Sequence, residues 1–203
     1  MKIFNTDCYG LTESIFRSGY PMKTEIADFT DVAKELLEID FAIADKNYDN
    51  PHIKRAIKLA NAGVGHSSFL AGIVVQMDVE APQYVWMQIE RYQFFRIISS
   101  QSKMHRLTQM DLRNGFLDGN YSSSALETAK TFIQGYKDEQ IDIEDMLNNV
   151  PMGLELTAGI STNFLSLQNM YRQRKNHRLK FWNTVFVDWI HTLPLSILIT
   201  GEE

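Results

Sequence analysis

The sequence of 203 residues is poor in cysteine and contains only one, Cys8. No disulfide can therefore form within the chain, which is typical of proteins from reducing compartments. No side chain near Cys8 in the sequence has the chemistry of an activating base, so a catalytic thiol is not indicated. We expect a function that does not depend on this cysteine.

Long apolar runs are also absent. No segment reaches the roughly 18 consecutive apolar residues that a membrane-spanning helix needs, and the first ten residues, MKIFNTDCYG, lack the apolar run of a secretory signal. Internal repeats, low-complexity tracts and Gly/Ser/Pro-rich linkers are missing as well. We expect a cytoplasmic protein without a membrane partner, folded as one domain over residues 1–203.

An excess of positive charge is missing too. The net charge of −5 argues against a general binder of duplex nucleic acid. Residues 172–180, RQRKNHRLK, nevertheless carry five Lys or Arg. A solvated helix end and a phosphate-facing patch both explain this cluster, and the sequence leaves the two open. No metal site is predicted.

Most of the sequence shows the periodicity of helices. Apolar residues at spacings of three and four, together with capping patterns, predict helices over residues 31–43, 51–62, 83–98, 124–135, 142–148, 163–174 and 179–193. Alternation of apolar and polar residues predicts one strand over residues 73–79. Residues 1–27 are predicted to be irregular. The expected fold class is α+β, a helix-rich single domain with a modest sheet.

The predicted helix after Pro82 carries an unusual polar pair. Gln88 and Arg91 are three residues apart and would share a helical stripe with Tyr84 and Phe95. A buried guanidinium requires a carboxylate, carbonyl, water or anionic partner. The stripe is therefore explained either by an internal salt bridge or by the wall of a ligand site.

Two other segments contain candidate binding residues. Residues 63–70, GVGHSSFL, precede the predicted strand and offer His66, Ser68 and sterically accessible backbone amides, although such a run is often only a turn. The helix over residues 163–174 places Asn163 and Arg174 on one stripe, separated by roughly 16 Å at 1.5 Å per residue. A helix of this length would contact a long ligand at both ends.

In chain order, these motifs resemble the flavin-dependent thymidylate synthases. The matching segments are H-S-S-F-L-A-G before the strand, V-E-A-P at the strand-to-helix turn, Q-I-E-R in the helix, S-S-Q-S-K-M-H after it, and N-F-L-S-L-Q-N-M-Y-R-Q-R twelve residues after Pro151. The matches cover residues 63–102 and 148–177, about a third of the chain. The resemblance implies that family's helix-rich fold with a modest sheet.

The resemblance also implies a role for each matching residue. His66, Ser68, Asn163 and Asn169 match positions that contact FAD, and Arg91 matches a residue that bridges flavin and nucleotide. Gln88 matches a residue that holds the base, and Arg174 matches the arginine that polarises the uracil of dUMP, so the implied catalytic residues are Arg174, Gln88 and Arg91. The nucleotide phosphate would lie against the segment from Ser99 to His105, with contacts from Ser100, Ser102 and Lys103.

Several charged positions of the family differ in this chain. The family's R-H-R is Arg91-Tyr92-Gln93, its Glu-His pair before the strand is Ala71-Gly72, and two of its arginines are replaced by Leu165 and Leu147. The arginine of its phosphate loop corresponds to Met104 or Lys103. Each lost charge-assisted hydrogen bond costs about 1.5–3 kcal/mol. The sequence therefore leaves three functions open: the family reaction, a flavoenzyme for another pyrimidine nucleotide, and a non-catalytic homologue that acts through assembly or protein binding.

The family reaction, if retained, has defined partners. FAD would be reduced by NADPH, and methylenetetrahydrofolate would supply the one-carbon unit that becomes the methyl group of dTMP. The reaction uses no cysteine nucleophile on the enzyme. The family's site is built between subunits of a homotetramer, so the resemblance also implies a homo-oligomer.

Overall fold

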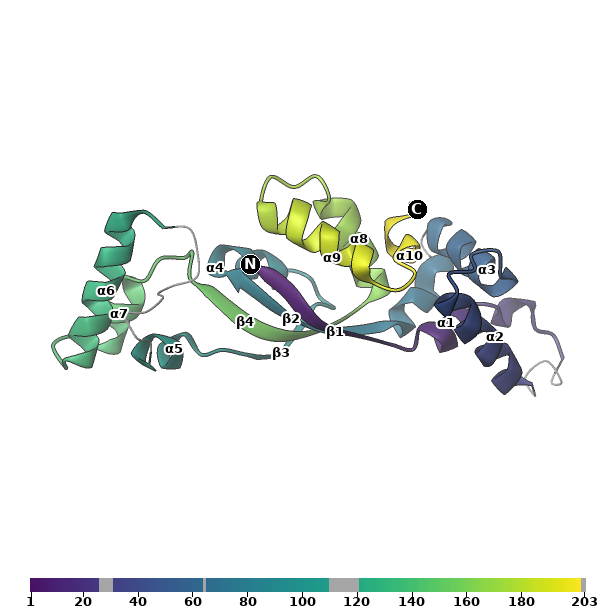
Figure 1. Cartoon of the computed structure of the whole chain (residues 1–203), viewed down its shortest axis with the longest axis horizontal. Coiled ribbons are helices and arrows are strands. Elements are labelled where there is room, and N and C mark those ends of the chain that lie inside the picture. Colours follow the sequence, from purple (N-terminus) through teal and green to yellow (C-terminus); the bar gives the residue numbers. More distant parts are fainter. Residues whose placement is uncertain (26–30, 64, 110–120, 202–203) are drawn as a thin grey trace. The chain divides into compact units, whose positions relative to one another are not determined.

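The computed structural model of the chain (Figure 1) describes residues 1–25, 31–63, 65–109 and 121–201. The chain falls into two compact units. Unit 1 comprises Met1–Phe4 and Asp78–Ile160, and unit 2 comprises Asn5–Met77 and Ser161–Glu203.

The strands form a four-stranded antiparallel sheet in the order β1-β2-β4-β3. Their bounds are β1 Lys2–Tyr9, β2 Val74–Pro82, β3 Arg96–Ser100 and β4 Glu155–Asn163. In β2 the side chains of Val75, Met77 and Val79 are buried while their neighbours are partly or fully exposed. This alternation is the one that predicted a strand, and the α+β fold class is confirmed.

Unit 1 contains four helices among its described residues. They are α4 Gln83–Ile89, α5 Lys103–Gln109, α6 Ser123–Lys137 and α7 Ile143–Asn148. Helices α6 and α7 lie side by side (Figure 1), and the apolar faces around them enclose a core of Leu107, Ala129, Ile133, Met146, Val150 and Leu154. This core forms because each helix buries one apolar stripe.

The helices described in unit 2 come from both ends of the chain. The N-terminal part contributes α1 Leu11–Arg17, η1 Tyr20–Met22, α2 Val32–Ala44, α3 Pro51–Asn61 and η3 His66–Gly72. The C-terminal part contributes α8 Phe164–Arg174, the π-helical segment η4 Phe181–Phe186, α9 Val187–Thr192 and α10 Ile197–Thr200.

A buried glutamine connects three of the helices in unit 2. The side-chain amide of Gln168, on α8, donates to the carbonyl oxygen of Ala60 at 3.1 Å and to that of Leu198 at 3.0 Å. Both carbonyls belong to the last turns of their helices, where no partner exists within the helix. Gln168 is 1% exposed, so these bonds form away from water and hold α8 against α3 and α10.

Several sequence predictions are confirmed with their caps. Helices α2, α3, α7 and α8 begin and end within two residues of the predicted bounds. Asn50 accepts hydrogen bonds from the backbone N–H groups of His52 and Ile53, Asp142 caps α7, and Asn163 caps α8. Local capping chemistry fixes these helix starts, which explains why the sequence alone was sufficient.

The prediction for the N-terminal segment was wrong. Residues 1–27 were expected to be irregular, but they contain β1 and α1; residues 26 and 27 lie outside the described part of the chain. Neither element has a clear periodic pattern, because β1 has no alternating burial and α1 buries three consecutive residues, Ser14, Ile15 and Phe16. Strands β3 and β4 were also missed, because sheet pairing rather than local pattern forms them.

Two predicted helices differ in detail. The capping box at Ser124–Glu127 was expected to start α6, but Ser122 is the cap, with its hydroxyl accepting from the N–H of Ala125 at 3.3 Å. The helix expected over residues 179–193 is not α-helical throughout. Its first part, Phe181–Phe186, is a π-helix. Segments of π-helix are rare and occur often at functional sites.

Candidate functional site

A cavity of about 470 Å³ lies in unit 2 beside η3. We call it the η3 cavity. Helix α1 and the residues after it contribute Ser14, Arg17, Ser18 and Pro21, and the other lining residues are Leu59, Gly65, His66, Ser68, Phe69 and Gly72. The structure thus brings together His66 and Ser68, two of the residues predicted to bind FAD.

The polar groups of the η3 cavity fit an anion. Arg17 and His66 are its ionisable residues, three serine hydroxyls accompany them, and no acidic side chain lines it. A further cation lies close, since Nε of Arg55 donates to the hydroxyl of Ser18 at 3.2 Å. Burial lowers the pKa of Arg55, although the guanidinium stays charged at neutral pH. Serine hydroxyls and guanidinium groups together are a common phosphate-binding set.

Sequence reasoning missed the contribution of α1 to this cavity. Ser14, Arg17 and Ser18 fall at spacings of three and four, which is one face of a helix. That spacing is visible in the sequence. The spacing led to no prediction, because the surrounding segment, residues 1–27, was predicted to be irregular.

Helix α8 carries the three predicted residues Asn163, Asn169 and Arg174. The side-chain oxygen of Asn163 accepts from the N–H of Ser166 at 2.9 Å, so it caps the helix, while Asn169 is exposed. Leu167 and Met170, on the stripe between the end residues, are fully buried. The middle of that stripe is therefore core, and its polar side chains, Asn163 and Arg174, lie at its two ends.

The guanidinium of Arg174 lies over an aromatic ring. Its central carbon is 4.8 Å from the ring centroid of Trp182, within the range of a cation–π contact. His177 follows one turn later, and its pKa is lowered by desolvation and by the positive charges of Arg174 and Arg178. The C-terminal end of α8 is thus a locally positive region in which imidazole is held mostly neutral at pH 7.

The predicted stripe of Gln88 and Arg91 is not present. Helix α4 ends at Ile89, so Arg91 lies beyond it, in a turn formed where the N–H of Tyr92 donates to the carbonyl of Ile89. Arg91 is exposed and Phe95 is buried, which places them on different surfaces. The following residues are rich in aromatic and β-branched side chains, and pairing of β3 in the sheet ends the helix early.

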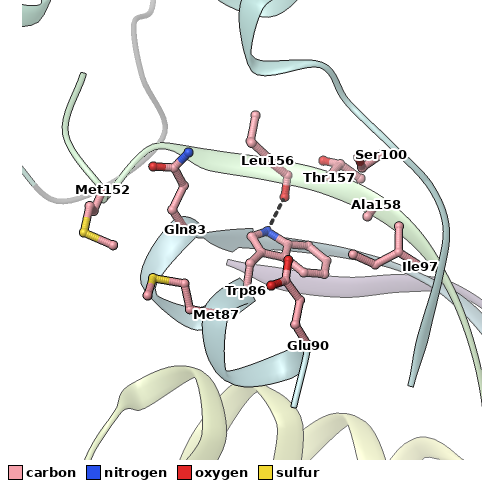
Figure 2. A pocket seen from close by; sticks show the side chains of 10 residues that line it. All are labelled: Gln83, Trp86, Met87, Glu90, Ile97, Ser100, Met152, Leu156, Thr157 and Ala158. Carbon is pink, nitrogen blue, oxygen red and sulfur yellow. Dashed lines mark hydrogen bonds between the residues drawn. The ribbon is translucent and has the colours of Figure 1, made fainter. Parts of the chain in front are cut away.

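A second cavity, of about 380 Å³, lies in unit 1 between α4, β3 and β4. Figure 2 shows Trp86 at its centre, with the indole N–H donating to the carbonyl of Leu156 at 3.2 Å; the same N–H also donates to Ala81 at 2.8 Å. The other lining residues are Gln83, Met87, Glu90, Ile97, Ser100, Met152, Thr157 and Ala158. We call it the α4 cavity. Its only charged lining residue is the acidic Glu90, so its lining by itself offers no cation to a phosphate.

Of the residues predicted to hold the nucleotide phosphate, Ser100 lines the α4 cavity, whereas Ser102 and Lys103 are not among its lining residues. The hydroxyl of Ser102 accepts from the N–H of His105 at 3.4 Å and thus stabilises the start of α5. The ammonium of Lys103 donates to the carbonyl of Leu147 at 3.3 Å, and desolvation lowers its pKa. Lys103 therefore places a cation against the backbone of residue 147.

Residues 1–25, 31–63, 65–109 and 121–201 contain no group of three or more His, Cys, Asp or Glu side chains arranged to hold a metal ion. Within the same ranges, no helix combines the length and the apolar character needed to cross a bilayer.

Comparison with solved structures identifies the fold. A flavin-dependent thymidylate synthase from Helicobacter pylori, complexed with FAD and dUMP, matches 100% of this chain and 98% of its own with a TM-score of 0.71 and 15% identity. The chain has the fold of the flavin-dependent thymidylate synthases. A second Helicobacter pylori structure of this enzyme with FAD and dUMP gives a TM-score of 0.67 at 12% identity, covering 100% of this chain and 97% of that one.

A related methylase also shares this thymidylate synthase fold. The UMP/dUMP methylase from Streptomyces cacaoi, bound with 5-Br UMP, aligns with 79% of this chain and 88% of its own, with a TM-score of 0.55 and 14% identity. No protein-family model matches the sequence, and no curated protein matches it either. At these identities, the likeness is one of fold.

Proposed function

We propose that the protein binds FAD and methylates a pyrimidine nucleotide, dUMP or UMP, with methylenetetrahydrofolate as the one-carbon donor. The observation that carries this proposal is the η3 cavity. It combines His66 and Ser68 with Arg17 and two more serines, and no acidic side chain lines it. A cavity of this size accommodates part of a dinucleotide, and its polar groups suit the phosphates.

The residues of unit 2 fit FAD in chemical type. Arg17, His66 and the serine hydroxyls would hold the phosphates by charge-assisted hydrogen bonds, and Asn163 and Asn169 would contact the cofactor from α8. When bound, FAD supplies hydride chemistry after reduction by NADPH. The protein contributes binding and orientation, because no nucleophilic cysteine is available: burial raises the pKa of the Cys8 thiol to about 11.

The nucleotide would be held by six other residues. Arg174 would donate to the uracil and stabilise negative charge that develops on the ring, while Gln88 and Arg91 would hold the base. Lys103 would supply the phosphate contact, supported by its position beside Leu147. Ser100 and Ser102 complete the proposed phosphate segment. By its relation to the family fold, the site would be completed by further copies in a homotetramer.

UMP is a candidate substrate beside dUMP. One structural neighbour is a UMP/dUMP methylase, so this fold accommodates both nucleotides. The replacement of family arginines by Leu147 and Leu165 removes contacts that would otherwise be shared with dUMP enzymes. The remaining alternative is a non-catalytic homologue that acts through assembly or protein binding. It is supported by the absence of the family's Glu-His pair and of its full R-H-R motif.

Flavin binding is the first test. Protein purified and titrated with FAD should show the flavin absorption band after gel filtration. Calorimetry should then give saturable binding of dUMP or UMP to the FAD-loaded protein. A protein that takes up no FAD at high micromolar concentration would contradict both enzymatic functions and favour the non-catalytic homologue.

Release of tritium is the second test. The FAD-loaded protein with NADPH and methylenetetrahydrofolate should release tritium from C5-labelled dUMP or from C5-labelled UMP, because replacement of the C5 hydrogen is part of methylation. Comparing the two labels identifies the substrate. Flavin binding without release from either label points to a different pyrimidine.

A further inference from the structure

The side chain of Arg174 rests on a rigid aromatic surface. Its guanidinium carbon is 4.8 Å from the ring centroid of Trp182, and Trp182 is fully buried with 0% exposure. Arg174 itself is only partly buried. The buried ring of Trp182 cannot move into solvent. It therefore gives the Arg174 guanidinium a fixed surface to lie on.

Neighbouring aromatic rings fix the orientation of Trp182. Phe181 meets it edge-on at a centroid distance of 5.0 Å and an interplanar angle of 85°, and Phe186 meets it at 5.4 Å and 73°. Both neighbours are at least 98% buried and belong to the same π-helical segment. Edge-to-face packing of this kind is favourable and directional, so the indole plane is well determined.

We propose that Trp182 is a positioning residue that holds the Arg174 guanidinium in the orientation needed to meet the pyrimidine nucleotide. This inference rests on the proposed function, since it names the residue through which Arg174 would act. A guanidinium carries its N–H donors in its own plane, in a fixed fork that suits a carbonyl oxygen, so the position of the group decides which atoms its donors meet. Arginine loses side-chain freedom when it binds a ligand, and prior contact with a ring reduces that loss.

A neighbouring contact shows the same arrangement. Nζ of Lys175 lies 5.4 Å from the ring centroid of Tyr171, and Tyr171 is 4% exposed. Two consecutive cations at the end of α8 therefore lie over buried aromatic rings. Cations near the C-terminal end of a helix also interact favourably with its dipole, which favours this placement.

The test compares aromatic and aliphatic replacements at position 182. Trp182→Phe retains a smaller aromatic face, whereas Trp182→Leu retains none. Titration of the FAD-loaded protein with dUMP and with UMP should show a Kd increased about five- to twentyfold by Trp182→Leu and less than about threefold by Trp182→Phe. FAD affinity should be unchanged in both variants.

Phe186→Leu provides the matched control. Phe186 is buried in the same aromatic cluster but is not the ring over which Arg174 lies. It should lower the melting temperature as Trp182→Leu does but weaken nucleotide binding less, because it loosens the indole without removing the ring that Arg174 contacts. In an Arg174→Ala background, Trp182→Leu should cause no further loss, because the group it positions is gone.

Fluorinated tryptophan gives a measurement that does not depend on a large volume change. Fluorine atoms withdraw charge from the indole face and weaken cation–π attraction while nearly preserving its shape. Nucleotide Kd should rise with the number of fluorines in the wild-type sequence. In Trp182→Phe protein, which keeps Trp86 and Trp189, the same labelling should have no effect.

The outcomes separate this inference from the proposed function. Wild-type protein that binds neither dUMP nor UMP overturns the proposed function and this inference with it. Wild-type binding that is unchanged by Trp182→Leu, unchanged by fluorination, or equally weakened by Phe186→Leu overturns the positioning role alone.

Discussion

At the scale of single residues, burial decides the chemistry of several polar groups. Cys8 is half-buried, and burial raises the pKa of its thiol to about 11 from an ordinary value of 9.0. Lys103 shows the corresponding effect on a cation, since desolvation lowers its pKa. In both cases, the low-dielectric surroundings disfavour the charged form.

Cys8 should therefore react slowly with alkylating reagents. At pH 8.5, a pKa of about 11 leaves about one thiol in three hundred ionised. The rate of reaction with iodoacetamide should rise about tenfold per pH unit towards pH 11, and mass spectrometry would follow it. Guanidinium-unfolded protein is the control and should reach its plateau near the ordinary pKa; a plateau at pH 9 in folded protein would contradict the burial.

The same shift affects stability at high pH. The pKa of Cys8 is higher in the folded protein than in the unfolded chain, so the unfolded chain loses its proton first. The contribution to stability is complete below about pH 9 and is lost as the pH rises from about 9 to about 11.

Thr162 should be replaceable with a gain in stability. Its hydroxyl is buried, the residue being 4% exposed, and it has no hydrogen-bond partner within the described part of the chain. Thr162→Val exchanges an unsatisfied hydroxyl for a methyl group and should raise the free energy of unfolding by about 1 kcal/mol. Urea denaturation would measure the change.

The control for this substitution is Ser67→Ala. The Ser67 hydroxyl is similarly buried but donates to the carbonyl of Gly63 at 3.4 Å. Its removal should lower the free energy of unfolding by about 1 kcal/mol, opposite in sign to Thr162→Val. Destabilisation by both substitutions would show that the Thr162 hydroxyl has a partner in solution.

At the scale of elements, helix α1 determines the charge of the η3 cavity. It is seven residues long and presents Ser14 and Arg17 to the cavity, with Ser18 immediately after it. The first serine is packed tightly, because a Cβ added at Gly72 would lie 2.6 Å from its hydroxyl oxygen. Gly72 therefore allows α1 to approach η3 closely, and a larger residue there would displace the helix.

Arg17→Gln tests this element. The substitution removes the charge while retaining hydrogen-bonding capacity, so FAD affinity should fall about five- to twentyfold because the phosphates lose a charge-assisted contact. Riboflavin, which has no phosphate, should bind equally to both proteins. Arg178→Gln, an exposed change elsewhere in unit 2, is the control. Equal weakening of riboflavin and FAD would place Arg17 away from the phosphates.

At the scale of the whole molecule, exposed apolar side chains indicate association. Met87, Ile97 and Met152 line the α4 cavity with exposures of 59%, 42% and 51%, and Ile98 beside them on β3 is 60% exposed. Every residue of β3 is exposed. Exposed apolar groups collected in this way commonly mark an interaction surface.

We therefore expect a homo-oligomer in solution. Analytical ultracentrifugation should show a mass well above the 23.4 kDa of one chain. Ile98→Glu should reduce that mass, because it places a charge on the apolar surface of β3. Met22→Glu, at a methionine that is 82% exposed in unit 2, is the control and should leave the mass unchanged.

The sequence by itself determined the elements that local chemistry specifies. Helices with a capping residue and a long apolar stripe, such as α3 and α8, follow from interactions within a few residues of each other. Strand β2 was also predictable, because its apolar and polar residues alternate strictly. The resemblance to the flavin-dependent thymidylate synthases singled out His66 and Ser68, and both line the η3 cavity.

Only the tertiary structure decided the rest. The early end of α4 at Ile89 and the formation of β3 and β4 depend on pairing between distant strands, which no local pattern contains. The contacts of Arg174 with Trp182 and of Lys103 with Leu147 likewise depend on packing. Side chains far apart in sequence acquire a role only when the fold brings them together, because hydrogen bonds and cation–π contacts act over only a few ångströms.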